Sequence, residues 1–202
     1  PSMANNVALS VVNVIGPSSA NTLELTLMTR ELIYDSWRNR IYASIASSEP
    51  FLGNSIVAID PETGVPDALV RVGSEPSQLA MSSDGRWLYV GVDGIMRIAK
   101  IDLQNASAPI TYFDLGFDRM FIAWDLKSQP GRPGTLAVAR KKYTGFEWID
   151  GAYPYDVVIY DAGRARMNAG RSTSMVEFSR DGAVLYGCIP QNYGYGLLRM
   201  PL

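Results

Sequence analysis

SSDGRWLYVG at residues 82–91 returns as SRDGAVLYGC at residues 179–188. In both copies, Ser-x-Asp-Gly precedes an apolar run that contains Leu-Tyr. An Asp-Gly pair supplies the positive φ that a tight hairpin turn needs, and the apolar run predicts the strand that follows the turn. A phrase that recurs along a chain indicates a fold built from equal units.

The spacing of the Leu-Tyr pair predicts four units. Tyr42, Tyr89 and Tyr186 follow an apolar partner in similar runs, and they lie 47 and then 97 residues apart. Half of the longer interval predicts a degenerate copy near residue 137, where GTLAVARK contains Leu136 and Ala137. A period of 47 to 49 residues therefore runs through the chain.

Each unit is expected to hold antiparallel strands. First strands are predicted at 31–35, 77–82, 120–125 and 174–179, and third strands at 54–60, 94–102, 156–161 and 194–200. Fourth strands are visible at 68–73 and 110–116, weaker in the third unit and missing from the fourth. Four such strands per unit, with almost no helical periodicity, predict an all-β protein with the β-propeller fold, in which each unit is one blade.

The expected domain organisation has two parts. Residues 1–20 are expected to form an N-terminal strand and linker, either the edge of an Ig-like domain or a closing strand of the ring. Residues 21–202 are expected to form the propeller, with blades at about 30–73, 74–116, 117–170 and 171–202. An ordinary β-sandwich is the structural alternative, but it does not require the fixed spacing.

Asp60, Asp102 and Asp161 each end a predicted third strand and precede turn residues. A carboxylate in this position can accept backbone N–H bonds in an Asx turn. A structural role for these three aspartates is therefore expected ahead of a catalytic one.

Composition excludes several classes of function. The formal net charge of −2 gives no broad attraction for nucleic acid, and no apolar run is long enough to predict insertion into a membrane. The absence of histidine excludes Ser-His-Asp and Cys-His catalysis and histidine-ligated metals. Cys188, the single cysteine, is expected to be a buried thiol, and neither a cofactor nor a metal is expected.

One long run resembles a known family. GNSIVAIDPETGVPDALVRVGSEPSQLAMSSDGRWLYVGVDG, residues 53–94, resembles the repeat of YVTN/YncE-like seven-bladed propellers, and VEFSRDGAVLYG at 176–187 is similar to a blade of these proteins. NNVALSVVN at 5–13 is similar to the closing strand of the IPT/TIG domain that often precedes such propellers. The resemblance implies a bacterial, extracytoplasmic protein at the cell surface or secreted.

The family has about seven blades, whereas this chain accommodates about four. The chain is then a piece of a longer propeller, a half that pairs with a second copy, or a small closed ring in which the N-terminal segment supplies the missing strand. We expect an incomplete propeller that is completed by self-association, as a homodimer.

The loops opposite the Ser-x-Asp-Gly turns are the expected ligand-binding surface. They lie at 47–53, 141–155 and 190–196, where polar residues and carboxylates alternate with aromatic rings that can stack on a sugar or a peptide. The alternative is that the rings cap the core or fill a subunit contact. The candidate ligand-binding residues are Phe51, Tyr143, Phe146, Trp148, Tyr153, Tyr155, Tyr193 and Tyr195.

Carboxylates near the same loops leave an enzymatic function open. Glu147, Asp150 and Asp156 are the candidate catalytic residues, and Asp93 and Glu49 are expected to project onto this face from neighbouring blades. Two carboxylates at a suitable separation can cleave a glycosidic bond as acid and base. The sequence favours a non-catalytic module that binds a glycan or a protein, with a carboxylate-dependent glycoside hydrolase as the alternative.

Overall fold

The computed structural model describes residues 14–15, 24–105, 107–116, 120–142, 155–171, 173–189 and 196–202. Within these ranges the regular structure consists of β-strands and one short 3-10 helix, Asp93–Ile95. The chain is therefore all-β, as the repeat pattern predicts.

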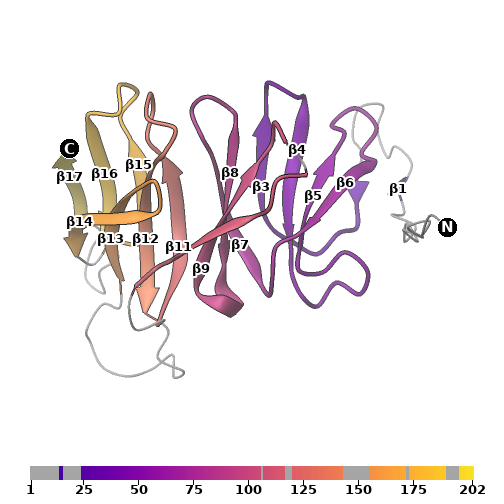
Figure 1. Cartoon of the computed structure of the whole chain (residues 1–202), viewed down its shortest axis with the longest axis horizontal. Helices are drawn as coiled ribbons and strands as arrows, with labels where there is room; N and C mark the ends of the chain where they lie inside the picture. The colour runs from indigo at the N-terminus through magenta and orange to yellow at the C-terminus, as the bar shows by residue number, and fades with distance from the viewer. Residues whose placement is uncertain are drawn as a thin grey trace.

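Four antiparallel sheets follow one another along the chain, and they are called blades 1 to 4 here (Figure 1). Blade 1 holds β3 (Thr29–Asp35), β4 (Arg40–Ile45), β5 (Ser55–Ile59) and β6 (Pro66–Arg71). Blade 2 holds β7 (Pro76–Met81), β8 (Trp87–Val92), β9 (Arg97–Asp102) and β10 (Thr111–Asp114). Blade 3 holds β11 (Phe121–Ser128), β12 (Thr135–Lys142), β13 (Tyr155–Asp161) and β14 (Arg164–Arg171), and blade 4 holds β15 (Met175–Phe178), β16 (Val184–Ile189) and β17 (Gly196–Pro201).

The sheets are arranged as propeller blades. In each sheet the strands lie in chain order, and the first strand of one blade contacts the first strand of the next, from β3 to β7, β11 and β15. The predicted β-propeller fold is confirmed. β14 supplies a full fourth strand in blade 3, where the sequence pattern shows it only weakly, and the described part of blade 4 has three strands.

The four blades form an open arc. Blade 4 and the C-terminus lie at one end of the molecule and blade 1 at the other, with β1 beyond it (Figure 1). β1 (Val14–Ile15) pairs with β2 (Glu24–Leu25) and not with blade 4. The described residues thus do not form the small closed ring in which the N-terminal segment completes blade 4.

The core lies between the blades, and the repeated Leu-Tyr pair contributes to two junctions at once. Leu88 packs in the cluster between blades 1 and 2, whereas Tyr89 packs in the cluster between blades 2 and 3. Successive residues of a strand point to opposite faces of a sheet, which explains the division. The leucine therefore faces the preceding blade, and the tyrosine faces the following one.

The Ser-x-Asp-Gly turns have the expected geometry. Gly85 and Gly182 adopt φ values of 67° and 70°, in the left-handed region that glycine tolerates best. In the first turn, Ser82 Oγ donates to Asp84 and accepts from the Trp87 N–H. Ser179 and Asp181 make the equivalent bonds in the second turn.

The aspartates that end the third strands have structural roles. Asp60 Oδ1 accepts from the N–H groups of Glu62 and Thr63, and Asp102 Oδ1 accepts from the Gln104 N–H, as in an Asx turn. Asp161 differs, because its carboxylate accepts from the Thr135 hydroxyl and from Arg166.

The expectation of a buried Cys188 is wrong. The thiol is partly exposed, because Cys188 lies on the face of β16 opposite Leu185, which packs on blade 3. The apolar run VLYGCI is typical of a strand that is buried on both faces. In the described part of the chain, however, only one face of blade 4 is covered.

Candidate functional site

The loop face, defined here as the end of each blade where its second and third strands are joined, is described only in part. Phe51, in the loop between β4 and β5, is 59% exposed, and Tyr155 is the first residue of β13. Six of the candidate aromatic residues and two of the three candidate catalytic carboxylates lie outside the described residues: Tyr143, Phe146, Trp148, Tyr153, Tyr193, Tyr195, Glu147 and Asp150.

A polar cluster lies on the loop face where blades 1 and 2 meet. Arg30, near the start of β3, binds Glu75 in the segment before β7 with an N–O distance of 2.5 Å. A second guanidinium nitrogen of Arg30 lies 3.5 Å from the carboxylate of Asp93. The cluster therefore holds one cation between two acids.

Asp93 is positioned by the end of its strand. It follows β8 directly and opens the 3-10 helix, and its Oδ1 accepts a 2.8 Å hydrogen bond from the Ser77 hydroxyl on β7. Burial raises the pKa of the Asp93 carboxyl to about 6, against the opposing effects of Ser77 and Arg30. The cluster therefore contains a group that changes its charge just below neutral pH.

The β4–β5 loop is held against this cluster. Ser47 donates to the Glu75 carboxylate, and the Glu75 N–H donates to Asn54 Oδ1 over 3.1 Å. Gly53 lies so close to the loop backbone that a Cβ at this position would come within 2.5 Å of the Glu49 carbonyl oxygen. The loop that carries Phe51 is thus anchored at both ends to Glu75.

Asp156, a candidate catalytic residue, is engaged in an ion pair. Arg140 Nε lies 2.8 Å from one carboxylate oxygen of Asp156, and Nη2 lies 2.5 Å from the other. The same guanidinium donates to the Leu115 carbonyl and lies over the Phe121 ring, 4.1 Å from its centroid. Asp156 therefore helps to hold blade 3 against the end of blade 2.

The structure brings together residues that sequence reasoning missed. Asp93 was expected on this face, but Arg30, Glu75 and Ser77 were not. Ser77 is the first residue of the SQLAM segment, and Arg30 comes just before the ELIYD run. Their contacts depend on how blade 1 packs on blade 2, which no local pattern in either blade specifies.

The described residues contain no group of three or more cysteine, aspartate or glutamate side chains arranged to hold a metal ion. Within the same ranges, no helix has the length and apolar character needed to cross a membrane.

Neither a protein-family model nor a curated protein matches the chain. Solved structures do match it. The chain is similar to Kuenenia stuttgartiensis hydrazine synthase, with a TM-score of 0.66 and 18% identity over 92% of this chain and 49% of that one. It is also similar to the dihydro-heme d1 dehydrogenase NirN in complex with DHE, with a TM-score of 0.58 and 16% identity over 86% of this chain and 35% of that one.

Both of these proteins contain β-propellers, and the chain spans about half of the first and about a third of the second. At these identities the likeness concerns the arrangement of the strands. The comparisons therefore show that this chain has the β-propeller fold.

Proposed function

We propose that the chain is a non-catalytic binding module of the YVTN/YncE-like type, which acts outside the cytoplasm of a bacterium and binds a glycan or a protein through its loop face. The family and the location rest on the resemblance of residues 53–94 and 176–187 to that repeat.

The exposed ring of Phe51 is the observation that carries this proposal. A ring on a mobile loop binds a ligand more weakly, because the loop must be ordered when the ligand binds. The loop that bears the exposed Phe51 ring is already tied to Glu75 through Ser47 and Asn54. An exposed ring on a loop that is anchored to a cluster of one cation, two carboxylates and hydroxyl groups suits a sugar or a peptide, because the ring stacks on C–H groups and the polar groups fix orientation.

A screen of immobilised glycans and peptides tests the proposal, followed by affinity measurements on two variants. Phe51→Ala should weaken the binding of the ligand found by about tenfold or more, because it removes the stacking surface. Val65→Ala is the matched control, since Val65 is also exposed but lies in the β5–β6 turn at the opposite end of blade 1. A ligand whose affinity is unchanged in Phe51→Ala would contradict a role for this ring.

The second candidate function is a carboxylate-dependent glycan-active enzyme that uses the same face. Asp93 supports it, because a carboxyl with a pKa of about 6 holds a proton in a useful fraction of molecules near neutral pH. Turnover of polysaccharides should then be lost in Asp93→Asn. Turnover that persists in this variant would remove Asp93 from the reaction, and Glu147→Gln and Asp150→Asn would test the other two carboxylates.

A further inference from the structure

The tip of the β3–β4 turn in blade 1 carries an exposed tryptophan. Trp37 is 61% exposed, and its backbone N–H donates a 2.9 Å hydrogen bond to the buried carboxylate of Asp35. The ring lies on Gly85 in the neighbouring turn of blade 2, since a Cβ on that glycine would lie 2.6, 2.7 and 3.1 Å from ring atoms Cδ2, Cε3 and Cε2. One face of the indole is therefore supported by the backbone of blade 2.

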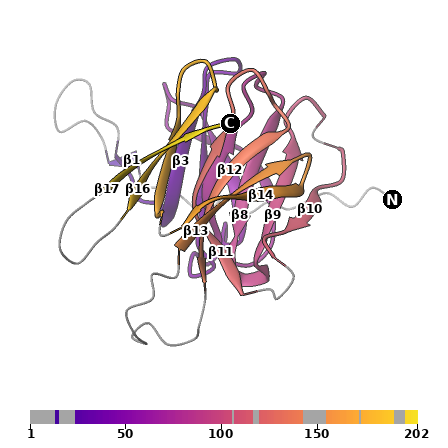
Figure 2. The same cartoon turned by 90° about the vertical axis from the view of Figure 1, so that its left-hand side faces the viewer.

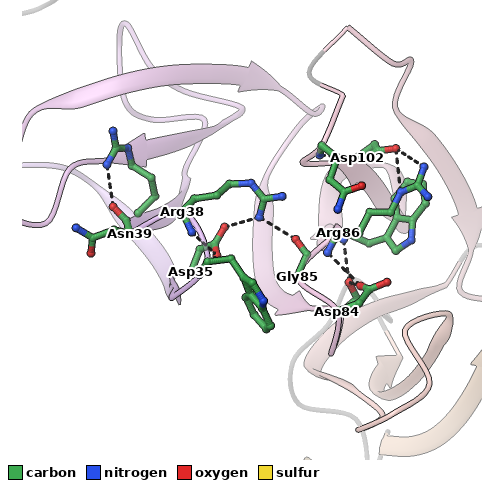
Figure 3. Close-up of polar contacts among 12 residues, drawn as sticks. Asp35, Arg38, Asn39, Asp84, Gly85, Arg86 and Asp102 are labelled. Atoms are coloured by element: carbon green, nitrogen blue, oxygen red, sulfur yellow. Dashed lines mark hydrogen bonds and ion pairs between the residues drawn. The ribbon is translucent and has the colours of Figure 1, made fainter.

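The support is rigid because the two turns are tied together. Arg38, next to Trp37, donates to the Gly85 carbonyl and to the Asp35 carboxylate, each over 2.8 Å (Figure 3). The Asp35 carboxylate also accepts from the backbone N–H of Arg38. A ligand that stacks on the ring does not have to order this turn first, which lowers the entropic cost of binding.

The exposure of Trp37 does not depend on what precedes blade 1. Residues 35–40 in blade 1 and 82–87 in blade 2 form turns of equal length between paired residues of the first two strands. Asp84 holds the position of Trp37 in the second turn and is exposed, although blade 2 packs against blades 1 and 3. The tip of this turn therefore points to solvent even in a blade with a neighbour on each side.

The fold does not require an aromatic ring at this contact. The turn of blade 3 reaches the Ser-x-Asp-Gly turn of blade 4 through Gln129, whose side chain donates to the Gly182 carbonyl over 2.7 Å. A Cβ on Gly182 would meet the Pro130 carbonyl and the Gln129 side chain, and no ring. Because this junction forms without a tryptophan, and because an indole that is 61% exposed gains little from burial, the ring of Trp37 is available for a ligand.

A hydrogen-bond acceptor flanks the ring. Asp84 precedes Gly85, and its Oδ1 accepts from the Ser82 hydroxyl and from the Arg86 N–H. The Ser82 hydroxyl lowers the pKa of the Asp84 carboxyl, which is therefore ionised at neutral pH. Oδ2 of Asp84 has no hydrogen-bond partner among the described residues, so it can accept from a hydroxyl group of a ligand.

The isolation of the ring favours a sugar over a protein partner. A stable protein interface buries about 800 Å² per partner around an apolar centre. In the turns at 35–40 and 82–87, both of them described in full, Trp37 is the only large apolar side chain that is exposed. One indole matches one pyranose ring, and pyranoses whose hydroxyl groups are all equatorial present apolar C–H groups on both faces. Glucose and N-acetylglucosamine in β-linked chains meet this requirement.

We propose that Trp37 and Asp84 form a binding site for β-linked chains of glucose or N-acetylglucosamine on the turn face, which is the end of each blade opposite the loop face. The indole stacks on one pyranose ring, and the Asp84 carboxylate accepts from a hydroxyl group of the bound chain. This site is separate from Phe51, and it does not depend on what the loop face binds.

Titration with cellohexaose and with chitohexaose, followed through the indole N–H signals in NMR spectra, tests the site. The chain has four tryptophans, and the signal that is missing from Trp37→Phe identifies Trp37. One or both hexaoses should shift this signal, and the shift should persist in Phe51→Ala. A Trp37 signal that neither hexaose moves at millimolar concentration would overturn the proposal. A shift that vanishes in Phe51→Ala would do so too, because the sugar would then bind on the loop face.

Affinities for the same hexaose, measured by calorimetry, test the role of the ring. Trp37→Ala should weaken binding by about tenfold, and Trp37→Tyr should retain most of the affinity, because tyrosine also offers an aromatic face. Gly85→Ala should weaken binding as well, since its Cβ displaces the ring. Gly131→Ala is the matched control, because this glycine has a similar positive φ and nothing lies within 4 Å of its Cβ position. An unchanged affinity in Trp37→Ala, or equal losses in the two glycine variants, would contradict the site.

Discussion

Arg38 Nη1 donates a 2.8 Å hydrogen bond to the carbonyl oxygen of Gly85, so that the turn of blade 1 is tied to the Ser-x-Asp-Gly turn of blade 2 (Figure 3). The same nitrogen lies 2.8 Å from the carboxylate of Asp35, which is fully buried. Gln129 and Gly182 repeat this relationship between blades 3 and 4 over 2.7 Å. The repeated turn therefore does more than reverse the chain, because it is also the point at which the preceding blade is fastened.

Arg38→Met should lower the free energy of unfolding by about 2–3 kcal/mol, because it leaves the buried Asp35 carboxylate without its cation and the Gly85 carbonyl without its donor. Arg40→Met is the matched control. Arg40 pairs with Asp60 and Asp67 at the surface, where ion pairs contribute about 0–1 kcal/mol. Urea unfolding followed by tryptophan fluorescence measures both, and equal losses would contradict the role of the inter-blade bond.

Gly85→Ala should destabilise the fold more than Gly131→Ala does. Both glycines have positive φ, 67° and 72°, so each variant carries a backbone cost of about 1–2 kcal/mol. A Cβ on Gly85 would also lie 2.6 Å from the Trp37 ring, whereas nothing lies within 4 Å of a Cβ on Gly131. Adding Trp37→Ala to Gly85→Ala should recover the part of the stability loss that exceeds the loss in Gly131→Ala. A double variant that is no more stable than Gly85→Ala alone would refute the close packing of these turns.

Asp93→Asn should be more stable than the wild type at pH 7, by about 1–3 kcal/mol, and this advantage should disappear as the pH falls toward 4. The pKa of Asp93 is raised to about 6, so between pH 4 and 6 the native state binds a proton that the unfolded chain does not. Stability from this group is thus present at low pH and is lost as the pH rises through 6. Urea unfolding of both proteins from pH 4 to 7 measures the difference, which would be independent of pH if Asp93 titrated normally.

Tyr89→Phe should lower the free energy of unfolding by about 1 kcal/mol, because the Tyr89 hydroxyl bonds the Pro133 carbonyl of the next blade over 2.9 Å. Burial raises the pKa of this phenol to about 12, so the hydroxyl keeps the proton that it donates. Tyr186→Phe should change the free energy of unfolding by less than about 0.5 kcal/mol, because partly exposed Tyr186 lies on the face of blade 4 that no described blade covers (Figure 2). Urea unfolding of both variants measures the difference, and equal losses would argue against the inter-blade bond of Tyr89.

The strands and turns could be predicted from the sequence because their signals are local. Asp-Gly demands a tight turn, and the alternation around Leu88 and Tyr89 predicts a strand with two covered faces. The bond from Arg38 to Gly85 could not be predicted, because it joins residues 47 positions apart whose contact depends on the stacking of two blades. The exposure of Cys188 was missed for a related reason, since its strand is patterned for a neighbour that the described chain does not supply.

The candidate site shows the same division. The exposure of Phe51 could be predicted from its polar loop. The position of Asp93 on the loop face could be predicted because it comes directly after a strand. The contacts of Arg30 with Glu75 and Asp93 arise at a blade junction, where one side chain bridges segments that are far apart in the sequence. Patterns within one blade carry no information about such bridges.

The affinity for a glycan or peptide found by the screen, measured for the wild type, Phe51→Ala and Val65→Ala, tests binding through the loop face most directly. The wild type and Val65→Ala should bind with the same affinity, and Phe51→Ala should bind more weakly by about tenfold or more, because its stacking surface is removed. An unchanged affinity in Phe51→Ala, or an equal loss in Val65→Ala, would contradict the account.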